Sequence, residues 1–171
     1  MKSYEIRPAV VEDENVLCDI FMSHIEAHPE YISHGEIQMG VGEGYFRDDE
    51  FVTRPAPEAR QYWMKYIHGN ITSPERAAVY KAVAGDGIVG FCVAGIMEDG
   101  AEPFGMICDV LVREASRTSG VGTALLDTAI SWLRSMNVRD IYLESGQENH
   151  AAHSYFMRRG FRKVSEIYKL A

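Results

Sequence analysis

Residues 106–123 read MICDVLVREASRTSGVGT and contain, in order, a strand, a polar turn and the start of a helix. Residues 106–112 are apolar and rich in β-forming side chains, interrupted only by Asp109, which predicts a mostly buried strand. After a polar connector, Gly120 and Gly122 open a helical pattern. The apolar positions of that pattern include Val121, Leu125, Ala129, Trp132 and Leu133. The strand–turn–helix order is the feature around which we interpret the rest of the chain.

The turn has the features of an anion site. Glycines at the start of a helix let a ligand approach the backbone, and the first-turn N–H groups have no acceptor within the helix. The helix dipole favours negative charge at this end, and Arg117 adds a cation beside it. The pattern Arg-x-x-Gly-x-Gly at 117–122 therefore favours phosphate binding, in competition with a plain turn that contains two glycines. It is not a Walker loop, because no Gly-Lys-Ser/Thr follows, and its glycine spacing does not fit a Rossmann loop.

Length and composition favour one domain over residues 1–171 with a sizeable core, since 46% of the residues are hydrophobic. The net charge of −8 argues against general binding to nucleic acid or to an anionic membrane. The three cysteines lack metal-site spacing, and we expect reduced thiols in a cytoplasmic protein and no metal. No apolar leader and no run of membrane-spanning length is expected.

The hydrophobic pattern predicts a mixed, mostly antiparallel sheet with helices on both faces, an α/β (α+β) fold. The expected strands are 3–7, 77–84, 88–96, 106–112, 140–144 and 162–170, and the expected helices are 12–28, 57–71, 121–136 and 149–159. Hairpin turns are expected at Gly85-Asp86-Gly87 and around Asp99-Gly100. Residues 31–57 are interrupted by glycines, and we expect a long acidic loop there.

Two motifs in this order resemble the GNAT superfamily of acyl-CoA-dependent N-acetyltransferases. The first is VREASRTSGVG at 112–122, and the second is Asn149-x-x-Ala152 followed by Tyr155-Phe156 and Gly160-Phe161. The resemblance covers 104–161 specifically and the rest of the chain loosely. It implies the GNAT fold, in which the sheet is splayed between its fourth and fifth strands, and acetyl-CoA as the acyl donor.

The resemblance also implies how acetyl-CoA would bind. The backbone of Val110, Leu111 and Val112 would pair with the pantetheine arm like a short added strand, and an N–H near Leu111 or Val112 would face the thioester carbonyl. The implied diphosphate site consists of Arg117, Thr118, Ser119, Gly120, Val121, Gly122 and Thr123. The implied contacts on the following helix are Asn149, Ala152, Tyr155 and Phe156. Asn149 also fits a plain helix cap, and both roles are compatible.

The family mechanism is direct attack of an amine on the thioester, with a proton removed from the amine and one given to the departing thiolate. Relatives often carry the acid as a tyrosine four residues before the glycine of the Gly-Phe pair. This chain has Phe156 there, which cannot donate a proton. Tyr155 is about 100° away around the helix, and it is either the acid or a core residue. Solvent or another side chain is the competing acid.

The base is a second open question. Many relatives carry adjacent acids on the central strand, where this chain has Cys108 and Asp109. Because side chains alternate along a strand, we expect these two to face opposite sides of the sheet. Asp109 is either a general base or half of a structural pair, since burying it alone would be costly. The further candidates for the base are Glu144, Glu148 and His150.

The sequence therefore predicts an acyl-CoA N-acyltransferase that moves an acetyl group to a primary amine. The acidic excess of residues 29–60 favours a cationic acceptor, either a small molecule or a peptide. An acyl-CoA-binding regulatory module with little or no turnover is the alternative, which Phe156 keeps open. A homodimer through the final strand and residues 29–60 is a further expectation.

Overall fold

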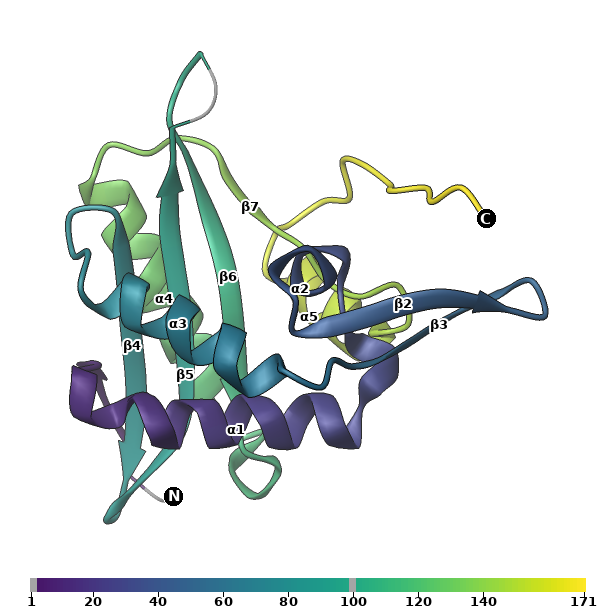
Figure 1. The fold of residues 1–171 in the computed structure, drawn as a ribbon. Coiled ribbons are helices and arrows are strands. Elements are labelled where there is room, and N and C mark those ends of the chain that lie inside the picture. Colours follow the sequence, from purple (N-terminus) through teal and green to yellow (C-terminus); the bar gives the residue numbers. More distant parts are fainter. Residues whose placement is uncertain (1–2, 99–100) are drawn as a thin grey trace. The chain divides into compact units, whose positions relative to one another are not determined.

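The computed structural model describes residues 3–98 and 101–171 (Figure 1). Contacts within the chain group it into two compact units. The sheet unit consists of Met1–Phe21 and Trp63–Leu143, and the hairpin unit consists of Met22–Tyr62 and Glu144–Ala171. The expectation of one domain over the whole chain stays a prediction.

The sheet unit contains a five-stranded mixed sheet in the order β1-β4-β5-β6-β7. Its strands are β1 (Glu5–Pro8), β4 (Ala77–Ala84), β5 (Gly87–Met97), β6 (Phe104–Val112) and β7 (Ile141–Leu143). Neighbouring strands are antiparallel except β6 and β7, which are parallel. Gly85 has a φ of 60° in the tight turn between β4 and β5, where glycine avoids the steric cost of that conformation. The predicted mostly antiparallel sheet is confirmed, and the expected turn around Asp99-Gly100 lies outside the described residues.

Helices cover both faces of this sheet (Figure 1). Helix α4 (Val121–Ser135) lies on one face and buries Val121, Leu125, Leu126, Ala129 and Leu133, the stripe expected of an amphipathic helix. The sheet-unit parts of α1 (Glu14–Ala27) and α3 (Ala59–Ile71) lie on the other face. There the Trp63 ring stacks on Phe21 with centroids 4.9 Å apart and meets Phe91 of β5 edge-on at 5.6 Å. No helix in the described part of the chain has both the length and the apolar character needed to cross a membrane.

The hairpin unit corrects the expectation of a loop over residues 31–57. The segment forms the short helix η2 (Pro29–Tyr31), helix α2 (His34–Met39) and a hairpin of β2 (Gly42–Arg47) and β3 (Glu50–Pro55). Ser33 starts α2 with a capping box, in which its side chain accepts from the Glu36 N–H and the Glu36 carboxylate accepts from the Ser33 N–H. Gly44 is a packing position rather than a loop signal, because a Cβ there would lie 2.4 Å from the Phe51 ring.

The expected final strand, 162–170, is wrong. Helix α5 (His150–Arg158) is followed by Gly160 with a φ of 96°, and residues 161–171 have no regular structure. The apolar side chains of this tail are exposed: Val164, Ile167, Tyr168 and Leu170. Val164, Tyr168 and Leu170 would share one face of a strand, but the described sheets contain no neighbouring strand for the tail to pair with.

The ring cluster around Trp63 generates a stability prediction. Trp63 is fully buried, and its Nε1 has no hydrogen-bond partner in the described part of the chain. We expect Trp63→Ala to lower the free energy of unfolding by about 3–5 kcal/mol, because it leaves a large cavity. Trp63→Phe should cost clearly less, because it keeps a ring and breaks no hydrogen bond. Urea unfolding of the two variants tests this, and equal losses would contradict the assignment of Trp63 to packing.

Candidate functional site

Strand β6 loses one of its two neighbours halfway along its length. Its pairing with β7 runs from Gly105↔Ile141 to Ile107↔Leu143, whereas its pairing with β5 continues to Gly90↔Val112. Among the described residues, 108–112 therefore pair on one side only. The expected splay between the fourth and fifth strands is confirmed, and it leaves a short strand edge that can bind an extended ligand.

The hydrogen-bond alternation of β6 identifies which backbone groups face this edge. The Arg113 N–H donates to the Val89 carbonyl at 2.8 Å, across from β5. In an antiparallel pair every second residue bonds the same neighbour, so the Leu111 and Asp109 amides also belong to the β5 side. Val110 and Val112 point their backbone groups to the open edge. Of the two amides expected to face a ligand carbonyl, this geometry favours that of Val112 over that of Leu111.

In the turn after β6, the side-chain hydroxyls bond to carbonyls of the turn itself and not to the first amides of α4. Thr118 Oγ1 donates to the Arg117 carbonyl at 2.6 Å, and Ser119 Oγ donates to the Ser116 carbonyl at 2.5 Å. Thr118 and Gly120 have φ values of 66° and 84°, which turn the chain sharply into α4. Gly120 is the N-cap of α4 and supplies no side-chain cap. The first backbone amides of the helix are thus not capped from within this turn.

The start of α4 meets the end of β6. The first intrahelical bond of α4 runs from the Ala124 N–H to the Gly120 carbonyl at 3.0 Å, so the Val121 and Gly122 amides precede it. A Cβ at Gly122 would lie 3.5 Å from Cγ2 of Val112, and Arg117 Nε donates to the Val112 carbonyl at 3.2 Å. The structure therefore brings the open strand edge, the Arg117 guanidinium and the positive end of a helix into one place. This combination fits a ligand with an extended arm and a phosphate group.

Asp109 lies on the same half of β6, beside a β-bulge. The register passes from Val93↔Asp109 to Ala94↔Ile107, which leaves Cys108 as an extra residue. Asp109 Oδ2 accepts a hydrogen bond of 2.8 Å from the Tyr66 hydroxyl of α3. The same hydroxyl acts on the Cys108 thiol through a hydrogen bond. The expectation that Cys108 and Asp109 face opposite sides is therefore wrong, because a bulge interrupts the alternation.

Burial controls the ionisation of this cluster. It raises the pKa of Asp109 from its ordinary value of 3.8 to about 6, against the hydrogen bond from Tyr66, which lowers it. It also raises the pKa of Cys108 to about 12 and that of Tyr66 well above 10. Tyr66 and Cys108 are neutral near pH 7, so Asp109 is not half of an ion pair. Its partner is a neutral donor, which leaves the carboxylate available as a base.

Sequence reasoning missed Tyr66. It belongs to the aromatic stripe Tyr62, Trp63, Tyr66 and Ile67, a pattern that is typical of a core helix. The alternation of apolar residues contains no signal that one of these hydroxyls meets an aspartate 43 positions later. Only the packing of α3 on the sheet shows it.

The remaining site candidates lie in the hairpin unit, on or near α5. Asn149 caps the helix, because its side chain accepts from the Ala152 N–H at 3.2 Å. The half-buried Phe156 ring lies edge-on to Tyr155 at 5.3 Å and to Phe161 at 5.9 Å. The cap role of Asn149 is therefore present, and the proton role of Tyr155 stays a prediction.

The three other base candidates have structural or exposed positions. The Glu144 carboxylate accepts from the Gly35 N–H at 2.7 Å, within the hairpin unit. Glu148 and His150 form an exposed pair at 3.5 Å. Among the described residues, no group of three or more His, Cys, Asp or Glu side chains is placed to hold a metal ion.

The raised pKa of Asp109 predicts a cost in stability at neutral pH. A carboxyl whose folded pKa exceeds its unfolded value stabilises the fold at low pH, and this stabilisation is lost as the pH rises through about 6. Asp109→Asn keeps an acceptor for Tyr66 and removes a partly buried charge. We expect the variant to gain about 1–3 kcal/mol of unfolding free energy at pH 7.5. The gain should shrink as the pH falls from 6 towards 4. Urea unfolding across this range measures it, and a loss of stability at pH 7.5 would contradict the burial of the charge.

The chain has clear structural relatives. A predicted acetyltransferase from Clostridium acetobutylicum, solved with acetyl-CoA, is 15% identical with a TM-score of 0.72, over 99% of this chain and 96% of that one. The PaiA N-acetyltransferase of Thermoplasma acidophilum, solved with coenzyme A, is 16% identical with a TM-score of 0.69, over 94% and 90%. The aminoglycoside 6′-N-acetyltransferase AAC(6′)-IG of Acinetobacter haemolyticus is 15% identical with a TM-score of 0.67, over 98% and 97%. At these identities the likeness shows the fold.

The sequence comparison goes further than the fold. A search of curated proteins finds no match. Residues 40–161, however, match the acetyltransferase (GNAT) family, and this range includes the strand edge, the glycine turn and helix α5. The chain therefore belongs to the GNAT family of acetyltransferases.

Proposed function

We propose that this protein transfers an acetyl group from acetyl-CoA to a cationic primary amine by direct attack, with Asp109 as the general base. The observation that carries the proposal is the placement of Asp109. Its carboxylate lies on the unpaired half of β6, it has a pKa of about 6, and a neutral tyrosine holds it. A base with this pKa is ionised at pH 7 and above and can accept a proton.

Acetyl-CoA fits the groups of the sheet unit. The open backbone of Val110 and Val112 suits the amides of a pantetheine arm, and the Val121 and Gly122 amides with Arg117 suit a diphosphate. Acetyl-CoA supplies the thioester carbonyl that the amine attacks. A backbone N–H on the open edge of β6 would then donate to the carbonyl oxygen as negative charge develops on it. The structural relatives solved with acetyl-CoA and coenzyme A support this donor.

The proton steps follow from the same residues. The amine forms the new C–N bond, its proton passes to Asp109 directly or through water, and the C–S bond breaks. The departing thiolate takes a proton to leave as a thiol. We assign that proton to Tyr155, because Phe156 has no proton to give. Direct attack needs no nucleophilic side chain, so the reaction requires only a base, an acid and the donor amide.

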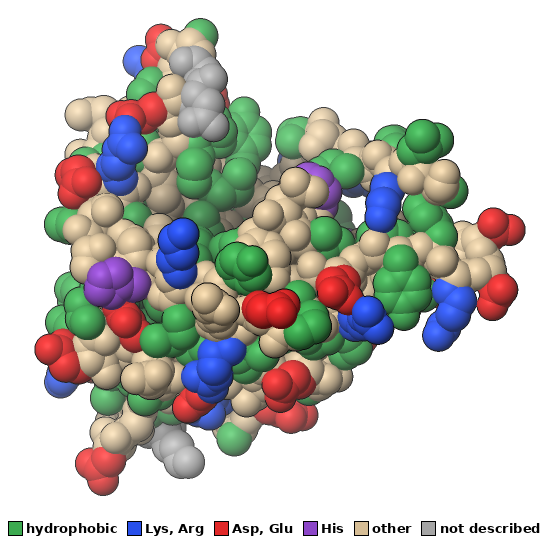
Figure 2. Space-filling view, viewed as in Figure 1, with side chains coloured by type: hydrophobic (Ala, Val, Ile, Leu, Met, Phe, Trp, Pro, Cys, Tyr) green, Lys and Arg blue, Asp and Glu red, His purple; other side chains and the backbone are tan. Residues whose placement is uncertain are grey.

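The acceptor class is inferred from charge. The ionised carboxylate of Asp109 attracts an ammonium group. Within the hairpin unit, the β2–β3 hairpin carries acidic side chains at its tip, which Figure 2 shows together with hydrophobic side chains along the strands. These acids are Asp48, Asp49 and Glu50. Two structural relatives, PaiA and AAC(6′)-IG, are named as N-acetyltransferases, one of them for aminoglycosides, which supports a small-molecule amine.

The donor site predicts the effect of charge at Gly122. Gly122 lies in the first turn of α4, where a new Cβ would make only ordinary contact with Val112. Gly122→Asp should therefore leave the fold intact but weaken coenzyme A binding at least tenfold, because its carboxylate repels a diphosphate. Gly122→Asn is the matched neutral control and should weaken binding much less. Calorimetric titration with coenzyme A compares them, and equal affinities for Asp and Asn would remove the diphosphate from this turn.

The reaction itself is tested by release of coenzyme A from acetyl-CoA over a panel of polyamines, aminoglycosides, amino acids and peptides. We expect turnover with at least one cationic amine. Asp109→Asn should lower kcat/KM by about 10²–10⁴-fold, and the acidic limb near pH 6 should disappear from its pH profile. A fully active Asp109→Asn variant would refute the base. Saturable binding of acetyl-CoA without turnover of any amine would favour a regulatory module.

A further inference from the structure

We infer that Tyr66 is the positioning residue of the base: it fixes Oδ2 of Asp109 so that Oδ1 is the atom offered to the acceptor amine. This inference rests on the proposed function, because it assigns a role towards Asp109. The two oxygens of the carboxylate are not equivalent. Oδ2 accepts the 2.8 Å bond from the Tyr66 hydroxyl, and the described residues provide no hydrogen bond to Oδ1.

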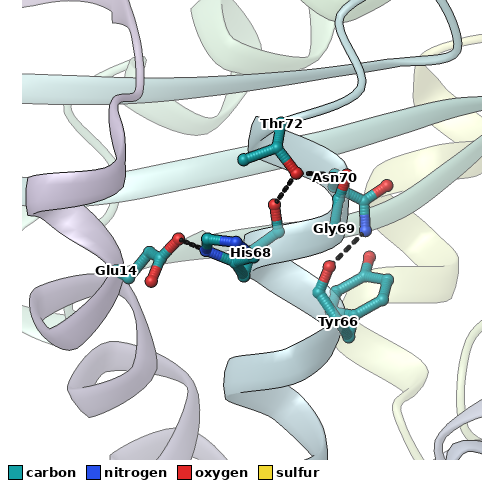
Figure 3. A network of polar contacts seen from close by, with 6 residues as sticks. All are labelled: Glu14, Tyr66, His68, Gly69, Asn70 and Thr72. Atoms are coloured by element: carbon teal, nitrogen blue, oxygen red, sulfur yellow. Dashed lines mark hydrogen bonds and ion pairs between the residues drawn. The ribbon is translucent and has the colours of Figure 1, made fainter.

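Tyr66 lies in the second half of α3, and polar contacts surround the residues that follow it (Figure 3). Asn70 Nδ2 donates to the Tyr66 carbonyl at 2.8 Å. Thr72 Oγ1 donates to the His68 carbonyl at 2.7 Å, which also accepts from the Thr72 backbone N–H at 3.0 Å. His68 Nδ1 in turn lies 2.7 Å from Oε1 of Glu14, on α1. Through His68, these contacts link the second half of α3, which carries Tyr66, to α1.

Packing also fixes the direction in which Tyr66 points. Trp63 and Ile67, on either side of it in α3, are fully buried. The Trp63 ring lies 5.6 Å from Phe91 of β5 and 6.0 Å from the Tyr66 ring. A helix anchored by these residues cannot rotate without breaking its core contacts. The Tyr66 hydroxyl is thus a fixed donor, and the carboxylate turns to meet it.

Burial is the main influence on the proton affinity of Asp109, and among the neighbouring groups Tyr66 is the one that opposes it. Tyr66 faces it from α3, Cys108 stands beside it on β6, and Cys92 lies on the neighbouring β5. All three have pKa values raised above their ordinary range, so none carries charge near pH 7. Burial drives Asp109 towards its protonated form, and the Tyr66 bond opposes this. Without the hydroxyl, more of the carboxyl would be protonated at neutral pH and unable to accept a proton.

The test is the pH profile of kcat/KM for Tyr66→Phe. A hydrogen bond to a charged group is worth about ten- to a hundredfold in an ionisation equilibrium. We therefore expect the acidic limb to move upward by about one to two pH units. Activity should fall about three- to twenty-fivefold near pH 6.5 for shifts of one to two units, and it should recover towards the wild-type value at high pH, with KM for acetyl-CoA unchanged. A purely structural role would lower activity equally at all pH values.

Two controls keep the outcome decisive. Tyr62→Phe removes an exposed hydroxyl one turn earlier in the same helix and should leave the limb in place. In Asp109→Asn, adding Tyr66→Phe should have no further effect on the pH profile, because the two residues act as one unit. A ¹³C NMR titration of the Asp109 carboxyl in the folded wild type and in Tyr66→Phe measures the expected upward shift of its pKa directly, without an activity assay.

The results separate the two claims. If Tyr66→Phe moves neither the acidic limb of the kcat/KM profile nor the titration of the Asp109 carboxyl, the positioning role is overturned. Asp109 remains the base in that case, provided that Asp109→Asn is inactive. A normal limb in Asp109→Asn would instead refute Asp109 as the base, and the role of Tyr66 with it. An upward shift in both measurements, absent in Tyr62→Phe, would support the inference.

Discussion

Strand β6 has two paired neighbours over its first half and one over its second half, and the rest of the site depends on this change. Unpaired backbone groups inside a protein are costly unless a ligand or water satisfies them. The chain leaves them open at residues 108–112, immediately before the turn that starts α4. The bulge at Cys108 lies at the same point and directs Asp109 and Cys108 towards one tyrosine. One irregularity in the sheet thus creates both a binding edge and the position of a carboxylate.

The sequence identifies the regular parts of this arrangement well. The apolar run before Val112 and the helical pattern after Gly120 mark a strand and a helix, and α4 begins at Val121 as the pattern indicates. Asn149 and Gly160 mark the two ends of α5, because a side-chain cap and a left-handed glycine are local chemical requirements. These features depend only on residues that are close in the sequence, so they can be predicted from one sequence.

The features that sequence reasoning missed depend on residues far apart in the chain. The bulge between β5 and β6 arises from the register of two strands, and the sequence around Cys108 contains no pattern that predicts it. The contact between Tyr66 and Asp109 needs α3 packed on the sheet before it exists. The glycines led to the wrong prediction of a loop. Gly44 belongs to a hairpin in which the Phe51 ring occupies the space that a side chain at this position would fill. The final apolar residues suggested a strand, but the described part of the chain offers them no neighbouring strand to pair with.

The choice of a tyrosine as the partner of Asp109 has a chemical reason. A lysine or arginine at the same distance would form an ion pair and lower the carboxyl pKa by about one to three units, which would make the carboxylate a poor acceptor of protons. It would also repel a cationic amine. Burial without any partner would raise the pKa further and leave the group protonated at pH 7. A neutral hydroxyl lies between these limits: it holds one oxygen of Asp109, opposes the effect of burial, and leaves the pKa at about 6. A carboxylate in that state is charged enough to attract an ammonium group and basic enough to take its proton.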